Sequence, residues 1–136
     1  LMQEHGGDPA EIKKLRTEDA ELVERDSKLA PDNADIFYRL GLLRYTLDDY
    51  DKAEAAFRAA CEKSPRNYEY LMALALLEEK RYVQTGETKY FTAAAETLKS
   101  MHDLNKDDPR AKQILQRLLG VWHERNPNAK GKEGTN

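Results

Sequence analysis

The strongest constraint in the sequence is a pair of matching segments that recur after 34 residues. Pro31 and Pro65 are separated by this distance, and their surroundings match, Leu-Ala-Pro-Asp-Asn against Lys-Ser-Pro-Arg-Asn. In both places a helix would end before the proline, and a polar residue after it could begin the next helix. Pro109 follows at one further period plus ten residues. A fixed period of this length is typical of helical arrays whose units bury their apolar faces against their neighbours.

The segment between the first two prolines predicts two amphipathic helices joined by a tight turn at residues 48–50. Apolar residues in its first half recur at spacings of three, four and seven, as on one buried helix face. In its second half, Ala53 and Ala60 are small enough to let two helix backbones approach closely. Phe57 would fill the gap between those backbones. We therefore expect residues 34–65 to form two antiparallel helices with Phe57 wedged between them.

This unit resembles one complete tetratricopeptide repeat. Seven positions agree with the pattern of that family: Phe37, Leu40, Gly41, Ala53, Phe57, Ala60 and Pro65. The tyrosine of the pattern falls on Arg44, whose stem we expect to pack while its charged head reaches solvent. The resemblance implies an all-α fold, a short right-handed superhelical array of antiparallel helix pairs.

A second, extended repeat is expected after the first. Its core positions would be taken by Leu71, Leu74 and Ala75 in one helix and by Ala94, Leu98 and Met101 in the next. Seven inserted residues amount to about two helical turns, so the buried face stays nearly in phase. Residues 85–87 predict the turn, with Thr88 as the cap of the following helix. The aromatic residues near this turn could anchor a partner or pack the two lengthened helices together: Tyr82, Tyr90 and Phe91.

The flanking segments complete the predicted array. Asp8 and Pro9 predict a helix start, but in that helix Asp19 and Asp26 fall where the repeat has small residues. In the last helix, the expected core residues are Leu115, Leu118, Leu119 and Trp122. The predicted division is therefore a diverged or capping helix at 9–30, a first repeat at 34–67, a second repeat at 68–109, a C-terminal capping helix at 110–124 and a disordered tail at 125–136. The opening at Leu1 in mid-repeat suggests a piece of a longer protein.

Charge and cysteine content narrow the function classes. The net charge is −3 with acids and bases interspersed, so we expect no nucleic-acid binding, which usually needs a basic face. Apolar runs are far shorter than the roughly 20 residues of a membrane-spanning helix. Cys61 is the sole cysteine of the sequence, so neither an internal disulfide nor a thiolate metal site is expected. The sequence leaves the cellular compartment open.

Enzyme chemistry needs convergent side chains, and the sequence offers few. His5, His102 and His123 are far apart and lack ligand partners three or four positions away. Cys61, beside Ala60 on a helix, is better explained as a packing thiol than as a nucleophile. We therefore expect no catalytic residues, no metal site and no cofactor, and we do not expect the chain to be an enzyme.

The family resemblance implies a concave face made by the first helix of each pair. The positions carried over as a partner-binding groove are Tyr38, Arg39, Leu42, Tyr45, Met72 and Leu76. The five apolar or aromatic residues among them would form its floor, and Arg39 could meet a carboxylate. The end helices could instead cover several of these positions. Family members that hold the acidic C-terminal tail of a chaperone use a clamp of Lys, Asn and Arg, and Tyr38 and Leu42 stand where the Lys and Asn would be, so we do not expect that partner.

Three classes of function fit these observations. The leading one is a protein-interaction module that presents the groove to a peptide or partner domain. The alternative is a structural appendage of a larger multidomain enzyme or secreted complex, docking on its own neighbour domain. The third, an RNA-binding array of similar repeat length, is disfavoured by the acidic composition.

Overall fold

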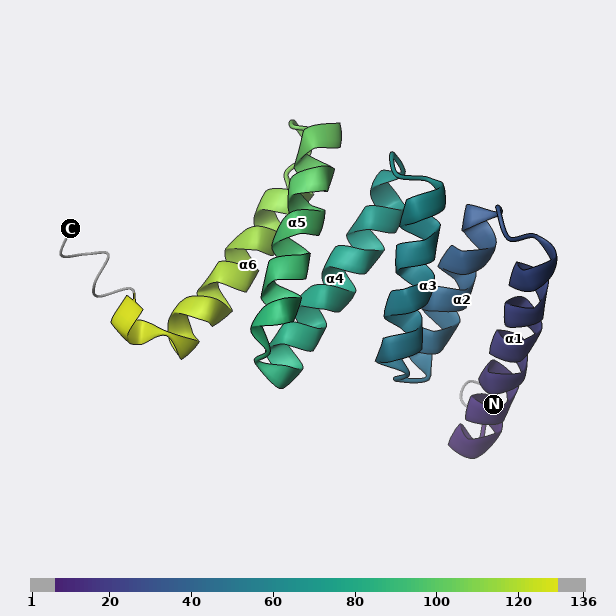
Figure 1. The fold of residues 1–136 in the computed structure, drawn as a ribbon. Helices are drawn as coiled ribbons and strands as arrows, with labels where there is room; N and C mark the ends of the chain where they lie inside the picture. The colour runs from purple at the N-terminus through teal and green to yellow at the C-terminus, as the bar shows by residue number, and fades with distance from the viewer. Residues whose placement is uncertain (1–6, 130–136) are drawn as a thin grey trace. The chain divides into compact units, whose positions relative to one another are not determined.

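A computed structural model describes residues 7–129, and within this range the secondary structure is helical without any strand (Figure 1). The helices are α1 (Pro9–Leu29), α2 (Ala34–Thr46), α3 (Tyr50–Lys63), α4 (Tyr68–Thr85), α5 (Thr88–Leu104) and α6 (Arg110–Arg125). These elements confirm the all-α expectation. The chain divides into two compact units, Leu1–Tyr70 and Leu71–Asn136, which are described separately below.

The first unit is built around the antiparallel pair α2 and α3. Asn33 caps α2 by accepting a hydrogen bond from the backbone N–H of Ile36, at 3.3 Å. Asp48 then takes a positive φ of 59°, which asparagine and aspartate tolerate better than other side chains. Asp49 caps α3 by accepting from the N–H of Lys52 at 3.4 Å. The predicted tight turn is thus made by two aspartates with different tasks.

Phe57 lies between α2 and α3, as the sequence predicts. It is only 2% exposed, and Ala53 and Ala60 on the same helix are fully buried. A Cβ added at Gly41 of α2 would lie 2.4 Å from two atoms of the Phe57 ring. Glycine is therefore required at this position because the ring occupies the space that any other side chain would need.

Helix α1 packs against α2 through a face that differs from the one at the equivalent repeat positions. Its buried residues are Ala20 and Ser27, and Ala20 joins a core cluster with Leu40 and Ala56. Asp19 and Asp26, which stand where the repeat has small residues, are exposed. The reason is that α2 packs against one side of α1 but against a different side of α3, its partner in the helix pair.

Arg44 corrects the expectation that its charged head would reach solvent. Its side chain is 9% exposed, and its Nη2 donates to Oε1 of Glu24 on α1 at 2.6 Å. Because α1 covers this part of α2, the guanidinium is enclosed and pairs with a carboxylate instead of hydrating.

The second unit contains most of α4 together with α5 and α6. The expected core residues Leu74, Ala75, Ala94, Leu98 and Met101 are all buried. The predicted turn contains Gly86 at a positive φ of 74°. The predicted cap is wrong by one residue: Glu87 precedes the first turn of α5 in an extended conformation, and Thr88 is already helical.

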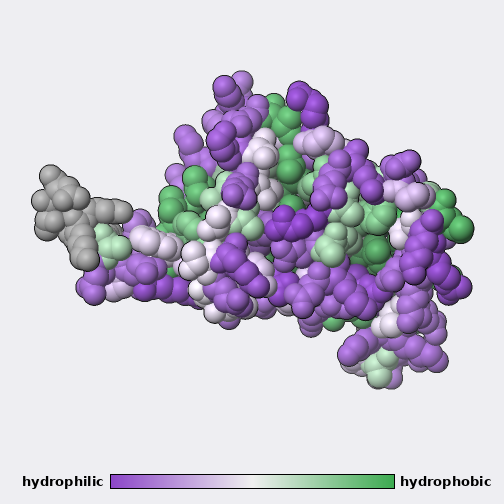
Figure 2. All heavy atoms as spheres, viewed as in Figure 1, coloured by the Kyte–Doolittle hydropathy of each residue, from purple (hydrophilic) through white to green (hydrophobic). Residues whose placement is uncertain are grey.

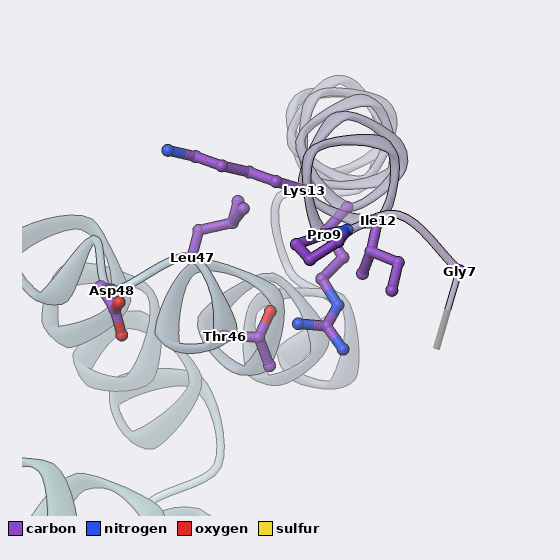
Figure 3. A pocket seen from close by; sticks show the side chains of 8 residues that line it. Gly7, Pro9, Ile12, Lys13, Thr46, Leu47 and Asp48 are labelled. Carbon is purple, nitrogen blue, oxygen red and sulfur yellow. The ribbon is translucent and has the colours of Figure 1, made fainter. Parts of the chain in front are cut away.

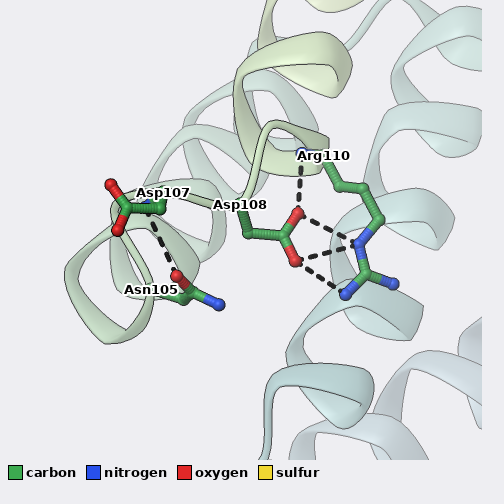
Figure 4. Close-up of polar contacts among 4 residues, drawn as sticks. All are labelled: Asn105, Asp107, Asp108 and Arg110. Carbon is green, nitrogen blue, oxygen red and sulfur yellow. Dashed lines mark hydrogen bonds and ion pairs between the residues drawn. The ribbon is translucent and has the colours of Figure 1, made fainter.

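Helix α6 begins at an aspartate–arginine contact (Figure 4). Asp108 accepts from the backbone N–H of Arg110 at 2.9 Å and from its guanidinium Nη2 at 2.8 Å. Preceding residues turn tightly, with Asn105 accepting from the N–H of Asp107 at 3.3 Å. The carboxylate satisfies an N-terminal donor of the helix and simultaneously holds the first side chain of that helix.

The buried face of α6 differs in part from the predicted one. Leu118 is buried as expected, but Ala111 and Ile114 accompany it. Leu119 is 37% exposed and Leu115 is half-buried. Within the second unit α6 packs mainly against α5, so one side of the helix is covered and Leu119 falls outside it.

The aromatic residues of the extended hairpin pack within the second unit. Tyr82 and Tyr90 are buried, the Tyr82 and Phe91 rings lie 5.4 Å apart in an edge arrangement, and Phe91 lies 6.3 Å from Trp122. These residues therefore hold the lengthened helices together.

The predicted division into repeats remains a prediction. Observed helices run through Arg125, and residues 127–129 add one helical turn. The rest of the predicted tail, residues 130–136, lies outside the described residues, as does His5.

Candidate partner-binding surface

Four of the predicted groove residues lie along α2 and two along α4. On α2, Leu42 is 41% and Tyr45 37% exposed, Arg39 is exposed and Tyr38 is half-buried. On α4, Leu76 is 41% exposed and Met72 is half-buried. Since α2 belongs to the first unit and these α4 residues belong to the second, each set forms a surface of its own unit.

On α2, Tyr38 is held by aromatic contacts on two sides. Its ring stacks on that of Tyr70 at 4.8 Å and lies 6.0 Å from Phe57. The Tyr70 hydroxyl donates to Oδ1 of Asp35 at 3.4 Å, and burial, followed by the neighbouring Asp35 carboxylate, raises the pKa of Tyr70 above its ordinary value. Tyr38 is therefore a fixed part of the surface.

Arg39 has a partner within its own helix. Its Nε lies 3.1 Å from Oδ2 of Asp35, and both side chains are more than half exposed. An exposed pair of this kind contributes little to stability and exchanges readily with solvent. The guanidinium can therefore turn to an incoming carboxylate at small cost, but Asp35 competes for it.

The remaining α2 residues form an exposed apolar strip. Leu42 and Tyr45 lie one turn apart on the same side of the helix, and the Tyr45 ring lies 5.6 Å from that of Tyr50 on α3. An exposed aromatic residue beside an exposed leucine is the kind of surface that anchors a partner.

The α4 surface has a polar border. Next to Leu76 along the helix, Glu79 accepts two hydrogen bonds from Arg117 of α6, at 3.0 and 2.7 Å. This contact raises the pKa of Arg117, with the hydrogen bond to Glu79 as the larger cause. The forked geometry fixes both side chains beside the apolar residue.

Several open depressions lie in the first unit. One, of about 410 Å³, lies where α1 begins and α2 ends, and Lys13 and Asp48 are on its rim (Figure 3). Another, of about 440 Å³, lies between α1 and α2 and is lined by Asp19, Leu22, Val23, Arg39, Leu42 and Leu43. The second is largely apolar, whereas the first combines cations with a carboxylate and a hydroxyl group.

Residues with metal-binding or nucleophilic chemistry lie apart in the described range. Within residues 7–129 no three His, Cys, Asp or Glu side chains are grouped closely enough to hold a metal ion. His123 packs edge-on against Trp122 at 5.2 Å, and Cys61 is half-buried on α3. None of the described helices combines the length and apolarity that crossing a membrane requires.

Helix α1 also carries an exposed row of leucines that was not predicted from the sequence. Leu15 and Leu22 are each 52% exposed and Leu29 is 85% exposed. Their spacing of seven residues was the available signal. Figure 2 shows hydrophilic residues over much of the visible face, with separate hydrophobic patches between them.

Antiparallel helix pairs with small residues at the contacts and a recurring motif define a helical-repeat protein. The family model of the tetratricopeptide repeat matches residues 20–68 and 38–109. These matches cover well over half of the chain, which therefore belongs to the tetratricopeptide repeat family and has its α-solenoid type of fold. As a member of this family the chain is, in general terms, a protein-interaction scaffold. A search of the curated proteins found no match to it.

Proposed function

We propose that this chain is a protein-interaction module that presents the exposed side of α2 to a peptide or partner domain, with the exposed α4 residues of the second unit as a separate contact surface. The observation that carries the proposal is the strip of Leu42 and Tyr45, which stays exposed on a helix whose opposite side is buried. Tyr38 next to this strip is held in place by stacking. A rigid aromatic residue beside exposed apolar side chains is typical of binding anchors, because little conformational entropy is lost when a partner covers them.

We further propose that the chain has no catalytic activity of its own. Helical repeats of this family typically bind rather than catalyse, and the residues proposed for contact are apolar, aromatic or basic. We propose protein or peptide as the partner class. Nucleic acid is disfavoured by the net charge of −3, since phosphate binding draws its affinity from clustered cations.

The test begins with peptides selected from a random library on the full chain. The affinity of a selected peptide would then be measured by calorimetry against Leu42→Asp and Tyr45→Ser. Each variant is expected to weaken binding about tenfold, which corresponds to roughly 1.4 kcal/mol.

Lys99→Ser serves as the matched control, because Lys99 is exposed on α5 and pairs with Asp103 of the same helix, at 2.9 Å. Selected peptides that bind both α2 variants as tightly as the unaltered chain would overturn the proposed surface.

A further inference from the structure

The exposed leucines of α1 belong to a narrow stripe that also carries two carboxylates. With 3.6 residues per turn, Leu15, Asp19, Leu22, Asp26 and Leu29 fall within about 80° of one another around the helix. All five side chains are exposed. An apolar row this regular on a solvent-facing side of a helix indicates a contact surface.

The repeat itself identifies what kind of surface this is. The 34-residue period places Asp19, Val23 and Asp26 at the positions of Ala53, Phe57 and Ala60. On α3 those positions are buried against α2, whereas on α1 both aspartates are exposed and Val23 is half-buried. The stripe is therefore one half of a helix-pair interface, open in the described part of the chain.

A groove runs beside this stripe, between α1 and α2. The 440 Å³ depression at Leu22 and Leu42 continues, through shared walls at Val23 and Arg39, into a second depression of about 280 Å³. The second is lined by Val23, Asp26, Leu29, Ala30, Ile36 and Arg39. Together they form a channel, which we name the end groove, along the second half of α1, with Asp19, Asp26 and Arg39 among its otherwise largely apolar lining residues.

The charged side chains on the walls of the end groove indicate which charge an occupant should carry. Asp19 and Asp26 stand seven residues apart, about 10 Å along the helix axis, on its α1 wall. Neither side chain forms an ion pair in the described range. Arg39 on the facing wall already lies beside Asp35. An occupant with cations spaced to meet the two aspartates is thus favoured over one with carboxylates there.

We propose that the end groove binds an amphipathic helix of a partner protein that carries two basic residues seven positions apart beside a leucine-rich stripe. A helix fits because the equivalent surface of α3 is covered by a helix, α2. A second copy of this chain is disfavoured as the occupant, because pairing α1 with another α1 would bring like-charged aspartates together. The end groove shares Leu42 with the α2 strip, but the inference rests on the stripe of α1 and remains testable whether or not the α2 strip of the proposed function binds a peptide.

The experiment uses the full chain and a designed helical peptide of about 18 residues, built on alanine and leucine with two lysines seven positions apart. The double variant Asp19→Lys, Asp26→Lys is expected to bind this peptide at least about tenfold more weakly. A peptide with glutamates in place of the lysines is expected to prefer the double variant over the unaltered chain. Leu22→Ser, which removes an apolar wall without changing charge, is expected to weaken both peptides.

The matched control is Glu18→Lys with Glu21→Lys, which alters the net charge by the same amount on exposed positions of α1 outside the groove. It should change affinity less than about threefold, and circular dichroism should show that every variant keeps its helical content. Equal weakening by the control double variant, or no binding to the unaltered chain at high micromolar peptide, would overturn the proposal. Tyr45→Ser should leave this binding unchanged, which separates it from binding at the α2 strip.

Discussion

The contact between Gly41 and Phe57 determines how α2 and α3 of the first helix pair fit together. A methyl group at Gly41 would lie 2.4 Å from the ring, a separation that requires the aromatic side chain or a helix to move. The ring in turn is almost completely buried. The two residues therefore determine together how closely α2 approaches α3.

A double-mutant cycle tests this coupling. Phe57→Ala should lower the free energy of unfolding by about 3–5 kcal/mol, because it leaves a cavity, and Gly41→Ala alone should lower it by about 1–3 kcal/mol. In the Phe57→Ala background, Gly41→Ala should cost much less, since the ring that it would strike is absent. Urea unfolding followed by circular dichroism measures all three values.

Gly120 supplies the control for this cycle. It lies within α6, and nothing stands within 4 Å of a Cβ added there. Gly120→Ala should therefore stabilise the chain by about 0.5–1 kcal/mol. Strictly additive effects of the Gly41 and Phe57 substitutions would contradict the close contact between them.

The ion pair of Arg44 with Glu24 should respond asymmetrically to substitution. The Arg44 side chain is enclosed, while that of Glu24 is 43% exposed. Glu24→Gln would leave an enclosed guanidinium without its counter-charge, and we expect a loss of about 1–2 kcal/mol in the free energy of unfolding. Adding Arg44→Met should recover most of this loss, because the apolar side chain needs no partner. Thermal unfolding of the two variants measures the loss of stability and its recovery. A Glu24→Gln variant as stable as the unaltered chain would show that the pair does not contribute to stability.

At the scale of the helices, the sequence predicts the buried face of a helix where that face follows from periodicity within one repeat. It does not predict the buried face where packing against a neighbouring helix determines it. The spacing of Ala53, Phe57 and Ala60 was sufficient to place their helix face correctly, because both partners of that contact lie within one repeat. For α1 the sequence register put aspartates at the small-residue positions of the repeat and left the buried face open, and in the structure Ala20, next to Asp19, turns toward α2. Which side of a helix is covered depends on the geometry of its neighbour, and that information is absent from the pattern of the helix itself.

The end of α4 is closed by a side chain from α6. Arg125 donates to the carbonyl oxygens of Tyr82 and Val83, at 2.9 and 2.6 Å, and its guanidinium lies 5.2 Å from the Tyr82 ring. Both carbonyls belong to the last turn of α4, where carbonyls commonly lack an intrahelical partner, and the Tyr82 carbonyl also accepts from the backbone N–H of Gly86 at 2.8 Å. A planar guanidinium can serve both acceptors simultaneously.

Removal of this contact should loosen the extended hairpin of the second unit. We expect Arg125→Ala to lower the free energy of unfolding by about 1–2 kcal/mol, with faster amide exchange at the start of α5. Arg125→Lys should recover less than half of the loss, because an ammonium group cannot hold both carbonyls in the same fork. Hydrogen exchange by mass spectrometry locates the effect, and an equal change throughout the chain would contradict a local role.

At the scale of the whole molecule, the sequence predicts the class of fold better than the binding surface. The recurring motif was enough to indicate an all-α repeat fold, since it fixes local helix pairing. Exposure of individual groove residues was not predictable: Tyr38 is half-buried by stacking on Tyr70, a contact between residues on different helices. The leucine row of α1 shows the reverse case, an exposed stripe whose spacing was visible but whose solvent-facing orientation depends on the packing of α1 against α2.

The charge distribution of the molecule predicts that it does not bind acidic C-terminal peptides. An acidic chaperone tail ends in a carboxylate and needs several cations or amide donors on one surface. On α2, Tyr38 and Leu42 occupy positions where such donors would stand, and Arg39 already shares Asp35 with Tyr70. Calorimetry with an acidic C-terminal pentapeptide should therefore show no binding at micromolar concentrations, and Asp35→Asn should improve binding only slightly, because one freed guanidinium cannot replace a clamp. Micromolar affinity, about −8 kcal/mol, would contradict this prediction, because it would require cations from elsewhere in the chain to reach this surface. The net charge of −3 makes such a cluster of positive charge unfavourable.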